Sequence, residues 1–449
     1  MPCLRAFRLG LCAAGLLAAC TAAPQGEITS VRFPPPSLPL GVAQSNRELA
    51  EDFLDLTFML ESGEALDGLL RYESPIRVHM ASPGLAPYRD DLEAVLARLR
   101  REAGIDIAET RDPNAAQIRI EAVPSAQIHR VFPTAACFIV PGETAWRSFL
   151  RRDPENRLRW SAQEELRSAA IFLPVDSMPQ DVRDCLNEEI TQALGPANDL
   201  YRLPNTIWND DNFHGIATSF DMVVLRALYQ PEFASGMTRD EVARRLPAVL
   251  DRVNPRGRGV PARARAPESR QWASAIEVAL SRNALRTRRL AAAEEAVRLA
   301  SAMRPVDHRL GVSLLTLGRL NLRRDPALAS EQFADAYRLF RDQFGTNDLR
   351  TAQAGVHVAA LALGTEQFEA AIQLADLHVP TAAAGQNAVL IAGFLSIKAQ
   401  ALYELGDLEG AQAVRIDSLR WARYGFGDSD GALAREQAQI AAILRLEEE

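Results

Sequence analysis

The stretch DCLNEEITQALGPAND, residues 184–199, decides how the first half of the chain is interpreted. Its apolar residues recur at the spacing of one helix face, which would pack on a sheet. That face consists of Leu186, Ile190, Ala193 and Leu194. Glu188 and Gln192 lie one turn apart on another face, and Gly195 is in the position of a C-terminal cap. The stretch therefore predicts an amphipathic helix with polar side chains on its open side.

Read from Glu188, the same stretch resembles the active-site helix of metzincin proteases, whose pattern is H-E-x-x-H-x-x-G-x-x-H or D. In that family the histidines and a third residue hold zinc, and the glutamate activates water. Glu188 lies at the first histidine position, Gln192 at the second and Asn198 at the third ligand position. The family's glutamate and glycine are matched by Glu189 and Gly195. The resemblance implies a degenerate zincin-like fold.

The residues at the three ligand positions are unsuited to zinc. Catalytic zinc sites are built mainly from imidazole with at most one carboxylate, and an amide oxygen is a weak ligand. The chain has six histidines, no two of which are spaced i, i+4, and His214 is the one nearest the helix. We therefore expect no catalytic residue, no metal and no cofactor. The alternative is a metal-assisted hydrolase with Glu189 as general base, aided by Glu188 and the loop NDDNFH at 209–214.

A longer series of residues resembles an uncharacterised family of bacterial envelope domains. The series runs through CLNEEITQALGPAND, NTIWND and FDMVVLRALYQPEFASGM, and the resemblance covers about residues 45–255. The shared positions are Cys185, Leu186, Glu188, Glu189, Gln192, Leu194, Gly195, Asn198, Asp199, Asn209, Asp210, Asp221, Leu228, Tyr229 and Pro231. The resemblance implies a fold like that of a degenerate zincin and no established function.

The candidate site comprises nine polar residues from this helix and the loops after it. They are Glu188, Glu189, Gln192, Asn198, Asp199, Asn209, Asp210, His214 and Asp221. Asp210, Asp211 and Asp221 could also pair with the helix glutamates as the two carboxylates of a glycosidase. Acidic residues in Asn/Asp-rich loops more commonly serve as turn and cap residues, and we adopt that interpretation.

Apolar runs around the helix predict the rest of the domain. Runs rich in Ile, Val and Phe predict strands at residues 76–80, 117–123, 137–140 and 170–175. Helical periodicity predicts helices at residues 45–61, 88–102 and 220–228. A few strands combined with long helices predict an α+β domain over residues 45–255.

Residues 1–19 have the layout of a lipoprotein signal peptide, with Arg5 and Arg8 before the apolar run Leu9–Leu17. That run is too short to span a bilayer as a helix. The sequence LAAC, which ends at Cys20, resembles the lipobox of bacterial lipoproteins. An ordinary cleaved signal is the alternative. The resemblance implies that an acylated Cys20 anchors the chain in the lipid bilayer of the cell envelope, with its body facing the periplasm.

Residues 20–44 are predicted to be the lipidated cysteine and a proline-rich tether. Thr21 follows the cysteine where Asp would favour the inner membrane, so we expect the outer membrane. The run RFPPPSLPLG at 32–41 favours extended polyproline structure.

Cys137 and Cys185 are the cysteines that remain besides Cys20 once the signal is removed. An even pair in an oxidising compartment predicts one disulfide. Two buried free thiols are the alternative, because no spacing rule ties so distant a pair.

Length and charge limit the classes of protein. The chain has 449 residues, which predicts two or three domains. Its net charge of −8 argues against nucleic-acid partners, which need clustered positive charge. The only lysine, Lys398, follows no Gly-rich loop, so a Walker-type phosphate site is excluded.

A second domain is predicted after a Pro/Gly/Arg-rich linker at residues 256–270. Similar passages occur at 332–346, 367–386 and 408–428. Glycines close them at positions 345, 385 and 427, which gives spacings of 40 and 42 residues. A period of this length predicts stacked helix pairs.

Residues 271–449 resemble tetratricopeptide repeats. The stretch AQALYELGDLEGAQ, residues 399–412, carries that family's order of small, aromatic and Gly-Asp turn residues. The polar segments PVDHRLG, TNDLRTA and DSDGALA lie where inter-repeat loops are expected. The resemblance implies an all-α helical solenoid that binds protein or peptide partners. The sequence thus predicts a non-catalytic binding or scaffold protein.

Overall fold

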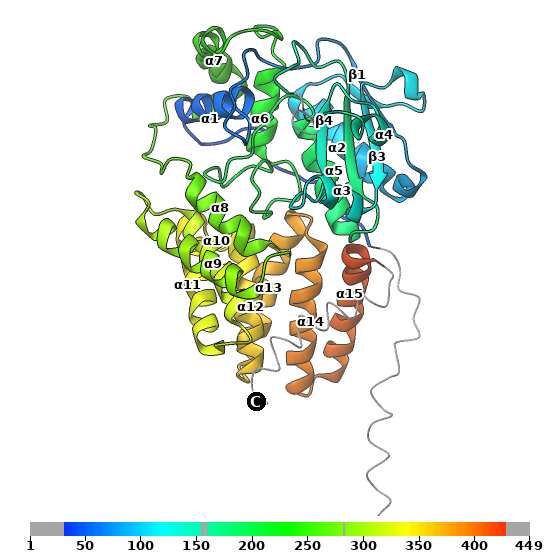
Figure 1. Cartoon of the computed structure of the whole chain (residues 1–449). Coiled ribbons are helices and arrows are strands. Elements are labelled where there is room, and N and C mark those ends of the chain that lie inside the picture. Colours follow the sequence, from blue (N-terminus) through cyan, green and yellow to red (C-terminus); the bar gives the residue numbers. More distant parts are fainter. Residues whose placement is uncertain (1–30, 154–157, 159, 282, 428–449) are drawn as a thin grey trace, which may run out of the picture.

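The computed structural model describes residues 31–153, 158, 160–281 and 283–427. These residues fold into an α/β unit and an all-helical unit, which lie one above the other in Figure 1. The predicted signal, Cys20, the first part of the tether and residues 428–449 lie outside the described residues. None of the helices described is long and apolar enough to cross a membrane.

A five-stranded mixed sheet forms the centre of the α/β unit. Its strands are β1 (Ile76–Met80), β2 (Ile107–Glu109), β3 (Ile118–Val123), β4 (Phe138–Pro141) and β5 (Ala169–Pro174). Their order is β2-β1-β3-β5-β4, and the first four are parallel while β4 runs antiparallel to β5. The predicted combination of strands and helices is confirmed as an α/β region, and its sheet is mostly parallel, which had not been predicted. Strand composition could not reveal this, because it carries no information on pairing direction.

Seven α-helices accompany the sheet. They are α1 (Asn46–Phe58), α2 (Arg89–Arg98), α3 (Ser125–Val131), α4 (Trp146–Phe149), α5 (Pro179–Gln192), α6 (Ser219–Leu228) and α7 (Arg239–Val253). Successive residues of β5 face opposite sides of the sheet, as strand geometry requires. Ile171 therefore joins the large core that includes α5, and Phe172 joins a smaller aromatic cluster with residues of α3 and α4.

Helix α5 is the amphipathic helix that the sequence predicted. Its apolar side chains Leu186 and Ile190 are fully buried in the large core. Cys185 forms a disulfide with Cys137, just before β4, with the two Cα atoms 6.0 Å apart. The predicted disulfide is confirmed, and the alternative of two free thiols is wrong. The bond ties α5 to the edge of the sheet.

The helical unit consists of antiparallel pairs. Its helices are α8 (Arg270–Leu280), α9 (Arg286–Ala302), α10 (His308–Asn321), α11 (Pro326–Phe344), α12 (Leu349–Gly364), α13 (Phe368–Ala384), α14 (Ala388–Glu404) and α15 (Leu408–Phe426). The three similar passages of the sequence fall on α11, α13 and α15. Gly345 and Gly427 end α11 and α15 with φ of 91° and 93°, a conformation that favours glycine.

The described part of the predicted tether packs on both units. Phe33 and Pro34 contact the helical unit, whereas the Leu40 carbonyl accepts a hydrogen bond from the α/β unit and the Val42 amide donates one to it. The ring of Phe33 lies 4.6 Å from that of Trp421 and 5.5 Å from that of Tyr424, both on α15. Gln386 Nε2 also donates a hydrogen bond to the carbonyl of Pro34. Phe33, which lies within the proline-rich run, thus fixes this part of the segment against α15.

The linker also packs, in this case on α1. Arg265 Nη1 lies 2.7 Å from the carboxylate of Asp52, a fully buried residue that also pairs with Arg202 at 2.5 Å. Basic residues of the linker therefore neutralise buried acid.

The two units meet at the N-terminal ends of α10, α12 and α14. His308 Nε2 lies 2.7 Å from the carbonyl oxygen of Tyr201. Arg350 donates to Asn205 Oδ1 at 2.8 Å and to the carbonyl of Pro204. Gln180 of α5 accepts a bond from the Ala388 amide at 3.1 Å. The polar segments between repeats thus hold the loop that follows α5.

Candidate functional site

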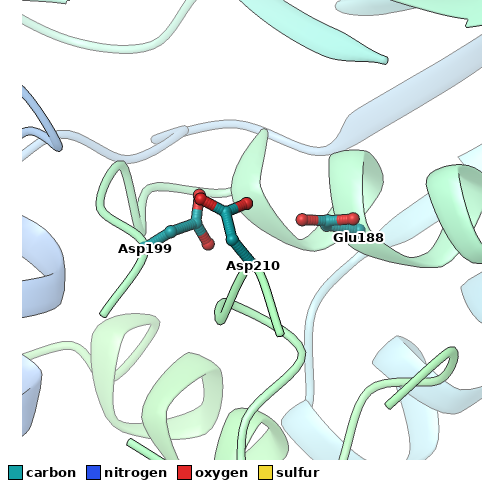
Figure 2. Close-up of side chains that lie close together, drawn as sticks. All are labelled: Glu188, Asp199 and Asp210. Carbon is teal, nitrogen blue, oxygen red and sulfur yellow. The ribbon is translucent and has the colours of Figure 1, made fainter. Parts of the chain in front are cut away.

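Three carboxylates from separate parts of the α/β unit meet at the open side of α5. Glu188, Asp199 and Asp210 each place one oxygen so that the three oxygens lie within 4.8 Å of one another. Figure 2 shows the carboxylates of Asp199 and Asp210 side by side, with Glu188 pointing toward them from α5. Glu188 and Asp199 are half-buried and Asp210 is exposed, so the group is open to solvent on one side.

A tight turn at Gly195 brings Asp199 back beside the helix. Gly195 has φ of 138°, which is accessible in practice to glycine alone. A Cβ atom at this position would lie 2.6 Å from the carbonyl oxygen of Leu70 and 2.7 Å from Cδ2 of Leu228. Only a residue without a side chain can therefore make this turn.

Further acidic groups surround the three carboxylates. Glu61 in the turn after α1, Glu189 on α5 and Glu277 on α8 all act electrostatically on the cluster. Glu189 is 4% exposed, and its Oε2 atom is buried without a hydrogen-bond partner. Asp199 Oδ1 is likewise buried and unpartnered. The site concentrates negative charge.

Burial and mutual repulsion raise the pKa values of these carboxyls. Burial is the main cause for Glu188 and Asp199, and neighbouring negative charges raise both pKa values further. For Glu189, burial followed by the charges of Glu61 and Asp210 raises the pKa to about 8. Most molecules therefore carry a proton on Glu189 at neutral pH.

The two amide residues of the metzincin-like frame are already hydrogen-bonded. Gln192 Nε2 donates to Asp199 Oδ2 at 2.7 Å, so this side chain orients the acidic cluster. Asn198 Nδ2 donates to the carbonyl oxygen of Asp55 at 2.9 Å and fastens the turn to α1. The amide nitrogens of both residues therefore hold parts of the fold together.

Three other candidate residues shape the loop before α6. Asn209 Nδ2 donates to the Leu203 carbonyl at 2.7 Å. His214 Nε2 lies 3.1 Å from the Pro204 carbonyl, and burial, followed by the charge of Arg350, lowers the pKa of His214 to about 4. The loop therefore presents Asp210 to the cluster while His214 points elsewhere.

Asp221 belongs to the start of α6 and not to the cluster. Its carboxylate accepts hydrogen bonds from the Thr218 amide at 2.6 Å and from the Ile207 amide at 3.1 Å. The residue is fully buried and forms a capping box with Thr218. These contacts give Asp221 the cap role that the sequence analysis adopted over a glycosidase pair.

The residues present do not fit a catalytic zinc ion. The group of potential ligands among the described residues consists of carboxylates alone. Zinc sites with open positions use imidazole or thiolate for most of their ligands. The chemistry available to three clustered carboxylates is the sharing of protons or the binding of a hard cation.

Sequence reasoning missed three residues near the cluster. Glu61 and Glu277 lie far from α5 in sequence, and no motif connects either of them to it. Asp210 is exposed as a residue, but its carboxyl is desolvated within the cluster; this desolvation raises its pKa, and a hydrogen bond with the Tyr201 hydroxyl lowers it by less. No spacing signal could have found these contacts, because they depend on the tertiary fold.

Fold and site together define an α/β domain with an acidic, imidazole-free centre, joined to a unit of paired helices. Residues 46–248 match the family model described as "Protein of unknown function (DUF2927)". The match agrees with the resemblance to an uncharacterised domain family that the sequence showed. Neither the curated proteins nor the solved structures contain a match to the chain.

Asp184, one turn before Glu188, is expected to make stability depend on pH. Burial raises the pKa of its carboxyl from 3.8 to about 7, although Gln180 donates a hydrogen bond to it at 2.8 Å. Because the folded-state pKa is the higher one, stability falls as the pH rises from about 4 to about 7. Asp184→Asn should therefore be more stable than the wild type by about 4 kcal/mol at pH 8 and about equally stable at pH 4. Urea unfolding at both pH values would measure this, and an equal change at both would contradict it.

Proposed function

We propose that this chain is an envelope-anchored binding protein, held in the membrane by lipid on Cys20. Its α/β unit is a non-catalytic, zincin-like domain, and its helical unit is a tetratricopeptide-like solenoid that binds protein or peptidoglycan-linked partners. The proposal rests on one observation above all. Gln192 and Asn198 lie at two of the three ligand positions of the metzincin-like motif, and their amide groups donate hydrogen bonds that hold Asp199 and the turn before it in place.

Two further features support a binding role. The units dock through hydrogen bonds from the N-terminal ends of three repeat helices, so a partner would meet one continuous body. The helical unit also exposes apolar side chains at the turn between α14 and α15. Tyr403, Leu405 and Leu408 are 57%, 45% and 62% exposed. Apolar side chains grouped at a surface are typical of sites for protein contact.

Photo-crosslinking in intact cells tests the binding role. A crosslinking residue at Leu408 should capture the same partner in repeated experiments, and one at the exposed Glu294 of α9 should not. Capture of identical products from both positions would indicate random encounters and contradict the proposal.

The hydrolase alternative depends on Glu189, whose buried oxygen lacks a hydrogen-bond partner beside the acidic cluster. A general base must be ionised at the working pH, whereas burial and neighbouring negative charges raise the pKa of Glu189 and favour its protonated form in the chain without a cation. Peptide hydrolysis by the purified chain that is abolished by Glu189→Gln would establish the alternative. We expect no hydrolysis above background in either protein.

The anchor is tested by Cys20→Ser. Without the thiol that would carry the lipid, the chain should move from the membrane fraction to the soluble periplasmic fraction. Loss of the lipid removes about 0.8 kcal/mol of membrane-binding free energy for each buried methylene group. The variant should therefore no longer remain bound to the membrane. Fractionation followed by immunoblotting measures the change, and a variant that still sediments with membranes would contradict lipidation at Cys20.

A further inference from the structure

We propose that Glu188, Asp199 and Asp210 form a binding site for a hard divalent cation of the calcium class. The metzincin-like motif predicts no metal, because Asn198 takes its third ligand position. The fold instead turns Asp199 toward the helix and adds Asp210 from the next loop. The ligand set therefore differs from the one that the motif suggests.

The spacing of the three oxygens suits an ion of this size. Three oxygens separated by no more than 4.8 Å all lie within about 2.8 Å of a common centre, so small side-chain shifts bring them to calcium–oxygen distances of about 2.3–2.6 Å. Magnesium demands a near-ideal octahedron with distances of about 2.1 Å, whereas calcium accepts irregular geometry, so we expect calcium to bind more tightly. Carboxylate oxygens alone, without imidazole or thiolate, also favour a hard cation over zinc.

Buried polar atoms at the site lack the partners that the chain provides elsewhere. Glu189, beside the cluster, is 4% exposed, and its Oε2 is buried without a hydrogen-bond partner. Asp199 Oδ1 is also buried and receives no N–H donor, and the side chain that contacts Asp199 there is another carboxyl, that of Glu61. In contrast, the fully buried Asp52 pairs with two arginines. Buried carboxylates require a compensating charge or hydrogen-bond donors.

No positive side chain supplies that charge. Within the described ranges, no arginine, lysine or histidine forms an ion pair with Glu188, Asp199 or Asp210. The charges recorded around them, those of Glu61, Glu189 and Glu277, are all negative. One divalent cation would offset two of the three negative charges of the cluster and give the buried oxygen of Asp199 a positive partner.

An ion at this position would join parts of the chain that also hold the helical unit. Asp199 and Asp210 lie at either end of the segment that presents the Tyr201 carbonyl and Asn205 to α10 and α12. The cation would connect this segment to α5 through Glu188. Bound calcium should therefore stabilise the whole described body, and not only the loop.

Calorimetric titration of the purified full chain with calcium chloride tests the site. We expect one calcium per chain, with a dissociation constant on the order of 10⁻⁵ to 10⁻⁴ M, and weaker binding of magnesium. Saturating calcium should raise the melting temperature by about 4 °C. Asp199→Asn and Asp210→Asn should each weaken calcium binding at least about tenfold, because each removes a charged ligand.

Asp67→Asn provides the matched control. Asp67 is an exposed aspartate in a loop of the same unit, so its variant should bind calcium like the wild type. Terbium luminescence of the wild type, excited through the aromatic residues, adds a readout that needs no variant, and calcium should displace the terbium. The site is overturned if 10 mM calcium gives neither heat nor a melting shift, or if Asp199→Asn and Asp210→Asn bind as tightly as the Asp67→Asn control.

Discussion

Gly195→Ala is expected to destabilise the protein by at least about 4 kcal/mol, which is enough to unfold much of a typical domain. The new methyl group would lie 2.6 Å from a backbone oxygen, that of Leu70, and backbone cannot move aside as a flexible side chain can. The φ angle of 138° adds strain, since residues with a Cβ rarely adopt it. Chemical denaturation of the purified variant, followed by circular dichroism, measures the loss.

Gly104→Ala separates the clash from the cost of an unusual backbone angle. Gly104 also has a positive φ, 74°, but an added Cβ there would meet no atom within 4 Å. Its substitution should cost about 1 kcal/mol. If Gly195→Ala and Gly104→Ala reduce the unfolding free energy equally, the close contact between Gly195 and the Leu70 carbonyl adds no cost. The account of the turn that places Asp199 would then be wrong.

Arg350→Met is expected to destabilise the protein by about 3 kcal/mol and to weaken the contact between the two units. The guanidinium is 1% exposed, pairs with Asp348 at 2.7 Å and donates to Asn205 at 2.8 Å. It also stacks over the ring of Phe344 at 3.7 Å, a contact that methionine keeps in part. The loss should therefore report mainly on the missing hydrogen bonds and charge.

Arg338→Met is the control for this substitution on the neighbouring helix α11. Arg338 is 62% exposed and pairs with Asp335, three residues away on the same helix. Exposed pairs of this kind contribute little, so this variant should lose less than about 0.5 kcal/mol. Similar losses in the two variants, measured by urea unfolding, would show that Arg350 does not couple the units.

Elements with strong local patterns were predictable from the sequence. The run at 76–80 coincides with β1, and the runs near 118, 138 and 170 match β3, β4 and β5 within a residue or two. β2 was missed, because a strand of three residues carries too little pattern. The parallel order of the sheet was also missed, since pairing direction arises from tertiary contacts that no single strand encodes.

The candidate site was only partly predictable. Helical spacing placed Glu188 and Gln192 on the open side of α5, and the resemblance drew attention to Asp199 and Asp210. The sequence did not indicate that Asn198 would turn toward α1, because the choice between adjacent residues depends on the angle of the turn at Gly195. The role of basic residues between repeats, such as Arg350, was equally hidden, since their partners lie in the other unit.

Zinc affinity of the purified full chain, measured by competition with a zinc chelator of known strength, tests the central claim most directly. Carboxylate oxygens in place of imidazole should bind zinc no more tightly than about 10⁻⁶ M, and extensive dialysis against the chelator should leave no stoichiometric zinc. Retention of one zinc per chain, accompanied by peptide hydrolysis that Glu189→Gln abolishes, would contradict a non-catalytic site.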